Sequence, residues 1–175
     1  MFVLGIDPGL SRCGYGLVQR SGSRLTAKAG GVVTTSPGTA LPERLLALFS
    51  ELRALVDEMR PDAVVVERVF FQTNVRTAMA TGQAGGLALL AAAQSGCEIA
   101  QYTSNEVKQA VVGFGGASKN QVQNMVAAVL EMAEPPSPPD VADALALAVC
   151  HLTAQPLRRA IEAAAGAGSG AGARP

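Results

Sequence analysis

The stretch "LGIDPGLSRCGYGLV", residues 4–18, reads as two short strands joined by a tight turn. An apolar run ends at Asp7, Pro8-Gly9 follows as a turn, and a second apolar segment punctuated by glycines comes next. Asp before Pro-Gly is common turn chemistry. Asp7 therefore either belongs to the turn or is a carboxylate presented at the end of a strand, and the rest of the chain must separate these readings.

Outward from this stretch, the pattern predicts strands at 2–6, 13–19, about 24–35, 62–67 and 98–102. The run "DAVVVE" (62–67) is typical of a central parallel strand buried on both faces. Helices are expected after Pro42, over 74–95, after Thr103, after Ser118 and from about Asp140. This order predicts an α/β fold with a five-stranded mixed sheet flanked by helices, and the simplest strand order is the ribonuclease H-like 3-2-1-4-5.

Length and composition favour one globular domain over residues 1–154, followed by an Ala/Gly-rich tail (155–175) that we expect to be disordered. The 14 basic and 14 acidic residues cancel, so net charge gives no support for a nucleic-acid partner. Cys13, Cys97 and Cys150 are too few and too scattered for a disulfide framework or a zinc site, which favours reduced thiols in a cytoplasmic protein. Neither a signal peptide nor a membrane span is expected.

Two predicted strands end in a carboxylate, "FVLGID" in Asp7 and "AVVVE" in Glu67. If these strands are parallel neighbours, both acids emerge at the edge of the sheet where α/β proteins bind ligands. Taken singly, each acid is more simply explained as a turn residue or a solvated strand end.

"PPDVADALALAV" places Asp140 and Asp143 three residues apart in the first turn of a helix. An N-cap and a favourable helix dipole would explain them equally well. Four carboxylates that converge on one edge, however, require protonation or bound cations. Mg²⁺ is held by carboxylates, water and phosphate, and two such ions can clamp the attacking and leaving oxygens of a phosphodiester.

Basic and aromatic residues surround these acids in the sequence. Lys108 lies on the helix after the fifth strand, and Lys119 follows "GFGGAS" at a helix start, where it could hold a phosphate or be a solvated charge. Arg68, Phe70, Phe71 and Arg76 follow Glu67, a pattern that suits base stacking, although a single Phe is more often part of the core.

Four motifs follow one another along the chain: "GIDPG", "ERVFF…N", "EVKQAVVGFGGASK" and "DVADALALAVCH". In these motifs, and in their order and spacing, this chain resembles the RuvC family of Holliday-junction resolvases from residue 2 to about 152. The resemblance implies a ribonuclease H-like homodimer that nicks four-way DNA junctions symmetrically with Mg²⁺ or Mn²⁺, in recombination and DNA repair. It also implies RuvA and RuvB, a branch-migration motor, as partners.

Carried over by residue, the resemblance implies that Asp7, Glu67, Asp140 and Asp143 bind the metal. Lys108 and Lys119 match lysines that contact DNA near the scissile phosphate, with Lys119 aiding catalysis, and Phe70 matches a wedge at the junction centre. Asn74 matches the Asn after that loop. Many members carry a basic residue where this chain has Thr73. Either Arg68 or Arg76 replaces its phosphate contact, or this loop binds DNA differently, and the sequence leaves both alternatives open.

Three other functions stay open from the residues. A sugar-kinase-like or actin-like ATPase also begins with a strand, an Asp and a Gly turn, but needs two such domains. A non-catalytic junction-binding module and a ribonuclease acting on RNA–DNA hybrids are the others. The small-residue helix over 74–95 is a candidate dimer contact, although packing on the chain's own sheet would explain it as well.

Overall fold

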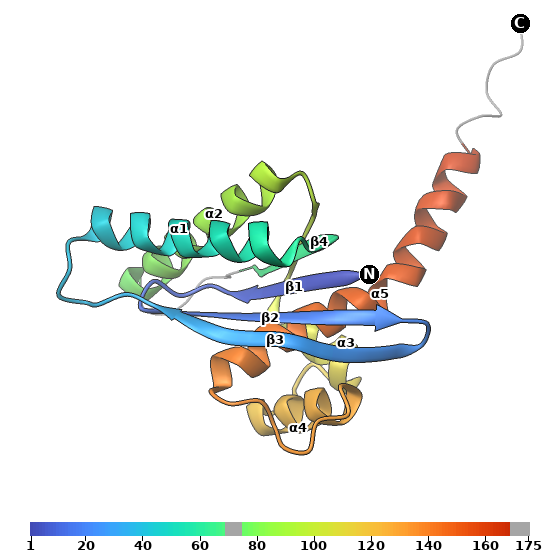
Figure 1. Ribbon diagram of the computed structural model, residues 1–175. Coiled ribbons are helices and arrows are strands. Elements are labelled where there is room, and N and C mark those ends of the chain that lie inside the picture. Colours follow the sequence, from blue (N-terminus) through green and yellow to red (C-terminus); the bar gives the residue numbers. More distant parts are fainter. Residues whose placement is uncertain (69–74, 169–175) are drawn as a thin grey trace, which may run out of the picture.

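The computed structural model describes residues 1–68 and 75–168, with side chains as far as residue 154. Figure 1 shows one sheet with helices on both of its faces. The strands are β1 (Phe2–Asp7), β2 (Arg12–Ser21), β3 (Arg24–Thr34), β4 (Ala63–Glu67) and β5 (Glu98–Tyr102). The helices are α1 (Leu41–Met59), α2 (Val75–Ser95), α3 (Ser104–Val112), α4 (Lys119–Val129) and α5 (Pro139–Gly168).

The strand order is β3-β2-β1-β4-β5, which confirms the predicted 3-2-1-4-5 sheet. β1 pairs antiparallel with β2, β2 pairs antiparallel with β3, and β1, β4 and β5 run parallel. In the β1–β4 register Ile6 lies opposite Val66. Asp7 and Glu67, the next residue of each strand, therefore emerge side by side at the same edge of the sheet.

Each face of the sheet has its own hydrophobic cluster because successive strand residues point to opposite faces. Leu4 and Ile6 pack with α1 and α2, whereas Val3 and Val65 pack with α3, α4 and α5. The inner side of α2 consists of small buried residues: Ala84, Gly85, Ala88, Ala91 and Ala92. Packing of this helix on its own sheet, one of the two readings left open, is therefore confirmed for this side of α2.

Two capping boxes set the starts of the helices nearest to the predicted site. Thr103 accepts from the Glu106 amide and caps α3, and Ser118 accepts from the Gln121 amide and caps α4. In each box the side chain of the third helical residue accepts a hydrogen bond from the backbone N–H of the cap residue, as the sequence pattern predicts. Lys119 is consequently held at the first helical position of α4.

The end of the chain differs in part from the expectation of a disordered tail from residue 155. α5 continues as a helix to Gly168, through Gln155 and Pro156, where the sequence pattern suggested that the core helix stops. Ala-rich segments favour the helical state intrinsically, which is the physical reason for the continuation. The division of the chain into a domain of residues 1–154 and a tail stays a prediction.

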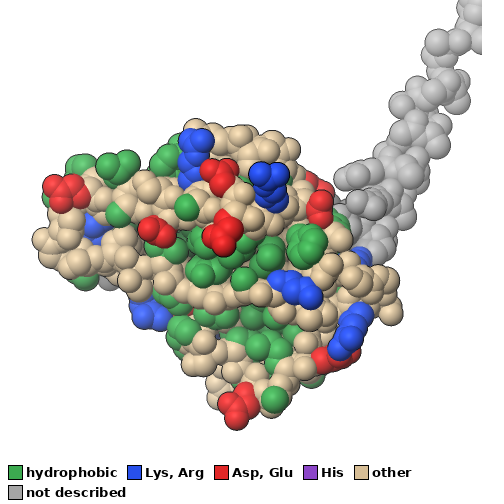
Figure 2. Space-filling model, in the orientation of Figure 1, with side chains coloured by type: hydrophobic (Ala, Val, Ile, Leu, Met, Phe, Trp, Pro, Cys, Tyr) green, Lys and Arg blue, Asp and Glu red, His purple; other side chains and the backbone are tan. Residues whose placement is uncertain are grey.

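Charged side chains of both signs are interspersed on the face of the molecule seen in Figure 2, in keeping with the zero net charge of the chain. All three cysteines are free thiols, as predicted, with Cys13 and Cys150 buried. Over the described part of the chain, none of the helices has the length and apolar character needed to cross a membrane.

Candidate active site

Asp7 and Glu67 share the face of the sheet that α5 covers. Val3 and Gly5 precede Asp7 at alternate positions of β1, and Val3 belongs to the cluster on the α5 side. Ala63 and Val65 stand in the same relation to Glu67 on β4. The alternation of strand residues therefore directs both carboxylates to the side of the sheet where α5 begins.

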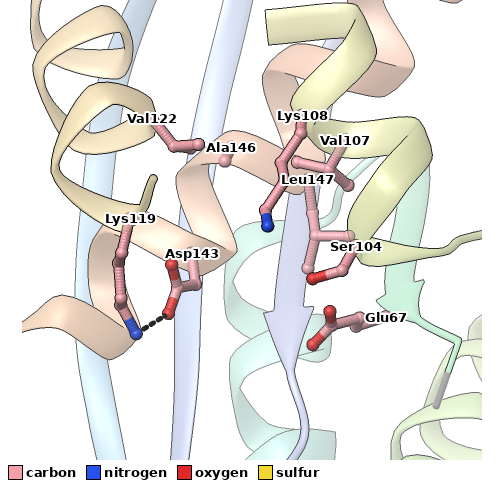
Figure 3. Close-up of a pocket in the computed structure, with 9 residues that line it drawn as sticks. All are labelled: Glu67, Ser104, Val107, Lys108, Lys119, Val122, Asp143, Ala146 and Leu147. Carbon is pink, nitrogen blue, oxygen red and sulfur yellow. Dashed lines mark ion pairs between the residues drawn. The ribbon is translucent and has the colours of Figure 1, made fainter. Parts of the chain in front are cut away.

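Asp140 and Asp143 reach this edge because α5 lies unusually close to β1 and β2. A Cβ atom on Gly14 would stand 2.2 Å from the carbonyl oxygen of Asp140, and one on Gly5 would stand 1.9 Å from that of Ala144. Only glycine allows such an approach of helix backbone to strand backbone. Figure 3 shows Asp143 on this first part of α5, facing Lys119 of α4.

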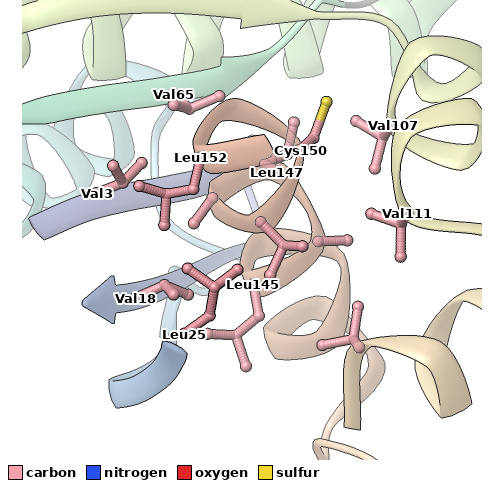
Figure 4. Close-up of a cluster of buried hydrophobic side chains, with 14 of the residues drawn as sticks. Val3, Val18, Leu25, Val65, Val107, Val111, Leu145, Leu147, Cys150 and Leu152 are labelled. Carbon is pink, nitrogen blue, oxygen red and sulfur yellow. The ribbon is translucent and has the colours of Figure 1, made fainter. Parts of the chain in front are cut away.

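The following turns of α5 anchor its acidic first turn. Leu145 and Leu152 are buried among Val3, Val18 and Leu25 of the sheet, and Figure 4 shows these side chains from the two layers in contact. Asp140 lies inside the first turn, after Pro139, and its carboxylate bonds to Arg12. Asp140 therefore does not occupy the N-cap position, which was one of the explanations offered for it.

Burial and neighbouring carboxylates change the protonation of Asp7. Its pKa is raised from 3.8 to about 7, first because burial disfavours the charged form and then because of the charges of Glu67, Asp143 and Asp140. A hydrogen bond with the Glu67 side chain acts in the same direction, since one of the two carboxyl groups must carry the proton. Glu67, Asp140 and Asp143 thus all lie close enough for their charges to act on Asp7 at this end of the sheet.

The two acids of α5 are each paired with a cation from another element. Nη2 of Arg12 lies 2.8 Å from Oδ2 of Asp140, and Nζ of Lys119 lies 2.6 Å from Oδ2 of Asp143. The bond from Arg12 lowers the pKa of Asp140, and the bond to Asp143 raises the pKa of Lys119. In this arrangement, no three His, Cys, Asp or Glu side chains of the described residues form a group that could hold a metal ion.

The donor set nevertheless fits a hard divalent cation. Four carboxylates, from β1, β4 and α5, offer only oxygen ligands, which Mg²⁺ and Mn²⁺ prefer. The raised pKa of Asp7 shows that negative charge is unfavourable at this edge unless a cation or a proton compensates it. Rotation of Asp140 and Asp143 away from their present partners would be required for all four to act as ligands.

A pocket of about 250 Å³ between α3, α4 and α5 adjoins these acids. Figure 3 shows Lys108 pointing into it from α3, with Ser104 near Glu67. Its walls combine the predicted residues Glu67, Asp143, Lys108 and Lys119 with the apolar residues Val107, Val122, Ala146 and Leu147. The structure therefore brings two of the predicted acids and both predicted lysines around one cavity.

The remaining predicted residues fall into two groups. Arg68 and Arg76 are exposed, Arg68 directly after β4 and Arg76 in the first turn of α2. The hydrogen bonds from Thr103 are the main cause of the lowered pKa of Glu106, and the charge of Arg68 acts in the same direction. Phe70 and Asn74 lie outside the described residues, as do Phe71 and Thr73, so their expected roles stay predictions.

Arg12 and Ser104 are site residues that the sequence analysis missed. Arg12 begins β2, and a short turn from Asp7 to β2 returns the chain to the edge where β1 ended. That short turn is the signal that could have identified Arg12. Ser104 is the first residue of α3 after its Thr103 cap, a position that local sequence alone does not relate to Glu67.

Comparison with known proteins identifies relatives along almost the whole folded part. The model of the RuvC family, described as crossover junction endodeoxyribonuclease RuvC, matches residues 3–151. The protein of that name from Salinispora arenicola is 54% identical over 166 residues, covering 94% of this chain and 95% of its own. The one from Pelotomaculum thermopropionicum is 49% identical over 151 residues, covering 86% and 92%.

Solved structures agree with this comparison. Thermus thermophilus RuvC has a TM-score of 0.83 at 35% identity, covering 90% of this chain and 97% of its own. The same protein in complex with a Holliday junction substrate has a TM-score of 0.82 at 34% identity, with 90% and 96% covered. The yeast mitochondrial Holliday junction resolvase, 12% identical with a TM-score of 0.68, supports the fold alone.

Proposed function

Because this chain belongs to the RuvC family of crossover junction endodeoxyribonucleases, we propose that it resolves four-way DNA junctions by paired symmetric nicks. The observation that carries the proposal is the convergence of two acids from parallel strand ends with two from the start of α5, where Asp140 lies in the first turn and Asp143 just after it. Two lysines line the pocket beside them. Carboxylates that can hold divalent cations, with lysines beside them, suit the hydrolysis of a phosphodiester.

Asp7, Glu67, Asp140 and Asp143 would hold the metal, which we propose to be two Mg²⁺ ions, with Mn²⁺ able to substitute. Held by these four carboxylates, such ions would supply activation of a water and stabilisation of a leaving 3′ oxygen, the chemistry that would give 5′-phosphate and 3′-hydroxyl ends. The raised pKa of Asp7 supports its role, because a carboxyl that readily loses its proton to a cation near neutral pH suits a metal ligand.

The chain's own residues position the DNA. Lys119, fixed at the start of α4 by the Ser118 cap, holds its ammonium group against Asp143 and can contact the scissile phosphate without moving its helix. Lys108 supplies a second positive charge in the same pocket. Exposed Arg68 and Arg76 would hold phosphates farther along the strand, and Phe70 and Asn74 would contact the junction beyond the described residues.

We propose that the enzyme is a homodimer whose contact lies on the outward side of α2. Val75, Met79 and Leu90 are 70%, 62% and 48% exposed, and Gly82 and Gly86 lie between them with open space around them. These five residues follow one another at intervals of three or four, so they form one apolar stripe on the helix. A two-fold dimer would place two sites to match the two-fold symmetry of a junction, which explains paired nicks.

The proposed setting is the cytoplasm, where the dimer would follow a RuvA and RuvB branch-migration complex in homologous recombination and DNA repair. The family resemblance is the basis for proposing RuvA and RuvB as partners. Their association with this chain can be tested by mixing purified components on a junction and resolving the complexes by native electrophoresis.

The experiment that tests the activity uses a synthetic four-way junction with a movable core. Wild type and Asp7→Asn are compared with and without Mg²⁺ on sequencing gels, and binding is measured in parallel. Paired symmetric nicks from wild type alone, with junction binding by both proteins, are the expected result. Absence of cutting with every divalent metal would overturn the proposal, and arms with ATP and with an RNA–DNA hybrid would then test the other functions.

A further inference from the structure

We propose that Arg12 couples DNA binding to metal binding, by holding Asp140 until a DNA phosphate takes its place. This inference rests on the proposed function. Both Nε and Nη2 of Arg12 donate to the same oxygen, Oδ2 of Asp140, at 3.3 and 2.8 Å. The two donors occupy Oδ2 and compensate the charge of the carboxylate, so Arg12 competes with a metal for this oxygen and weakens Asp140 as a ligand.

The backbone that carries Arg12 is held firmly in place. Arg12 pairs with Thr34 at the start of β2, and Gly9 lets the preceding turn close against the Arg12 carbonyl. Arg44 of α1 donates to Ser11 at 2.7 Å and to Thr35 at 2.9 Å, which ties the turn to α1 and to the chain beyond β3. The long side chain of Arg12 can therefore change partners while its backbone stays fixed.

The alternative partner follows from charge and exposure. The side chain of Arg12 is 51% exposed, so its guanidinium can reach solvent without any rearrangement of the core. When a divalent cation binds the carboxylate of Asp140, the guanidinium group of Arg12 no longer has its ion-pair partner. A DNA strand lying over the four acids brings phosphates to this edge, and Arg is well suited to bind them through two donors.

This exchange makes the two binding events cooperative. A phosphate that attracts Arg12 frees Asp140 for the metal, and a metal on Asp140 frees Arg12 for the phosphate, and the two effects must be equal in free energy. Free enzyme would consequently load metal less readily than enzyme on a junction. Lys119 and Asp143 form a similar pair, but Arg12 belongs to β2 and Lys119 to α4, and they bond to different carboxylates, so the contribution of Arg12 can be measured by its own substitution.

The test measures junction affinity with Ca²⁺ and with EDTA, for wild type, Arg12→Gln and Arg12→Lys, with Mn²⁺ binding to the free proteins measured by calorimetry. We expect Arg12→Gln to bind Mn²⁺ more tightly and to reduce the gain in junction affinity from Ca²⁺ by about fivefold, the effect of one exposed charge-assisted contact. In Ca²⁺, the slope of the logarithm of junction affinity against the logarithm of salt concentration should become shallower in Arg12→Gln, by about the amount expected for the loss of one phosphate contact. Arg12→Lys should keep part of the coupling, because it keeps the charge and loses the two-donor geometry.

Arg24→Gln is the matched control. Arg24 is similarly exposed and paired with Glu131, but it lies at the opposite end of β2 and β3. The inference would be overturned if Ca²⁺ increased the junction affinity of Arg12→Gln as much as that of wild type, or if free Arg12→Gln bound Mn²⁺ more weakly than free wild type. In both of these outcomes wild type still binds and cuts junctions. If the proposed function itself were wrong, wild type would neither bind nor cut them, so the two failures can be told apart.

Discussion

Replacement of Asp7 by asparagine should stabilise the metal-free protein at neutral pH while abolishing cleavage. The folded protein raises the pKa of Asp7 from 3.8 to about 7, chiefly through burial and the charge of Glu67. A difference of this size corresponds to roughly 4 kcal/mol of unfavourable free energy for the ionised form. Asparagine has nearly the same shape and no charge, so it removes this cost.

The pH dependence follows from proton binding. Between about pH 4 and pH 7 the folded protein keeps a proton on Asp7 that the unfolded chain has lost, so wild-type stability falls as pH rises through this range. The advantage of Asp7→Asn should therefore be small near pH 4 and should grow by about 2–3 kcal/mol between about pH 5 and about pH 8. In a domain of this size, that is a rise in melting temperature of roughly 5–10 °C.

The assay is urea and thermal denaturation of both proteins in EDTA across this pH range. Asp57→Asn, which removes an exposed carboxylate on α1, should change stability by no more than a few tenths of a kcal/mol and serves as the control. Added Mg²⁺ should narrow the difference, since it stabilises the protein that binds it better. An Asp7→Asn protein that is less stable than wild type at about pH 8 would refute the reasoning about buried charge.

Three further changes probe the helices around the site. Gly14→Ala places a methyl group against the Asp140 backbone and should cost about 1–3 kcal/mol in urea denaturation while also lowering junction cleavage; unchanged stability would show that α5 can move away freely. Lys119→Met should lower the single-turnover cleavage rate by about 100-fold with junction affinity changed only a few-fold, and an equal loss of both would assign Lys119 to DNA affinity alone. Met79→Glu should shift the sedimentation of the protein from dimer to monomer. Met125→Glu, on α4 at the other side of the sheet, should leave the dimer intact. If Met79→Glu remains a dimer, the contact lies on another surface.

Local chemistry explains why so much of the fold could be predicted from the sequence. The run of β-branched residues before Glu67 and the capping boxes at Thr103 and Ser118 depend on neighbours in the chain, so they could be read directly. The parallel arrangement of β1 and β4 follows from the order of strands and helices, and it places Asp7 beside Glu67. The sequence does not predict the continuation of α5 beyond residue 154, because proline and glycine residues such as Pro156 favour the end of a helix.

The sequence by itself determined the order of elements and the residue types at the strand ends and in the first turn of α5. Only the tertiary structure decided that Arg12 pairs with Asp140, 128 residues away, and that Lys119 pairs with Asp143. Both pairings depend on where α5 crosses the sheet, and that crossing depends on how closely its backbone approaches Gly5 and Gly14. The raised pKa of Asp7 has the same origin, because burial and the proximity of distant carboxylates are properties of packing and not of local sequence.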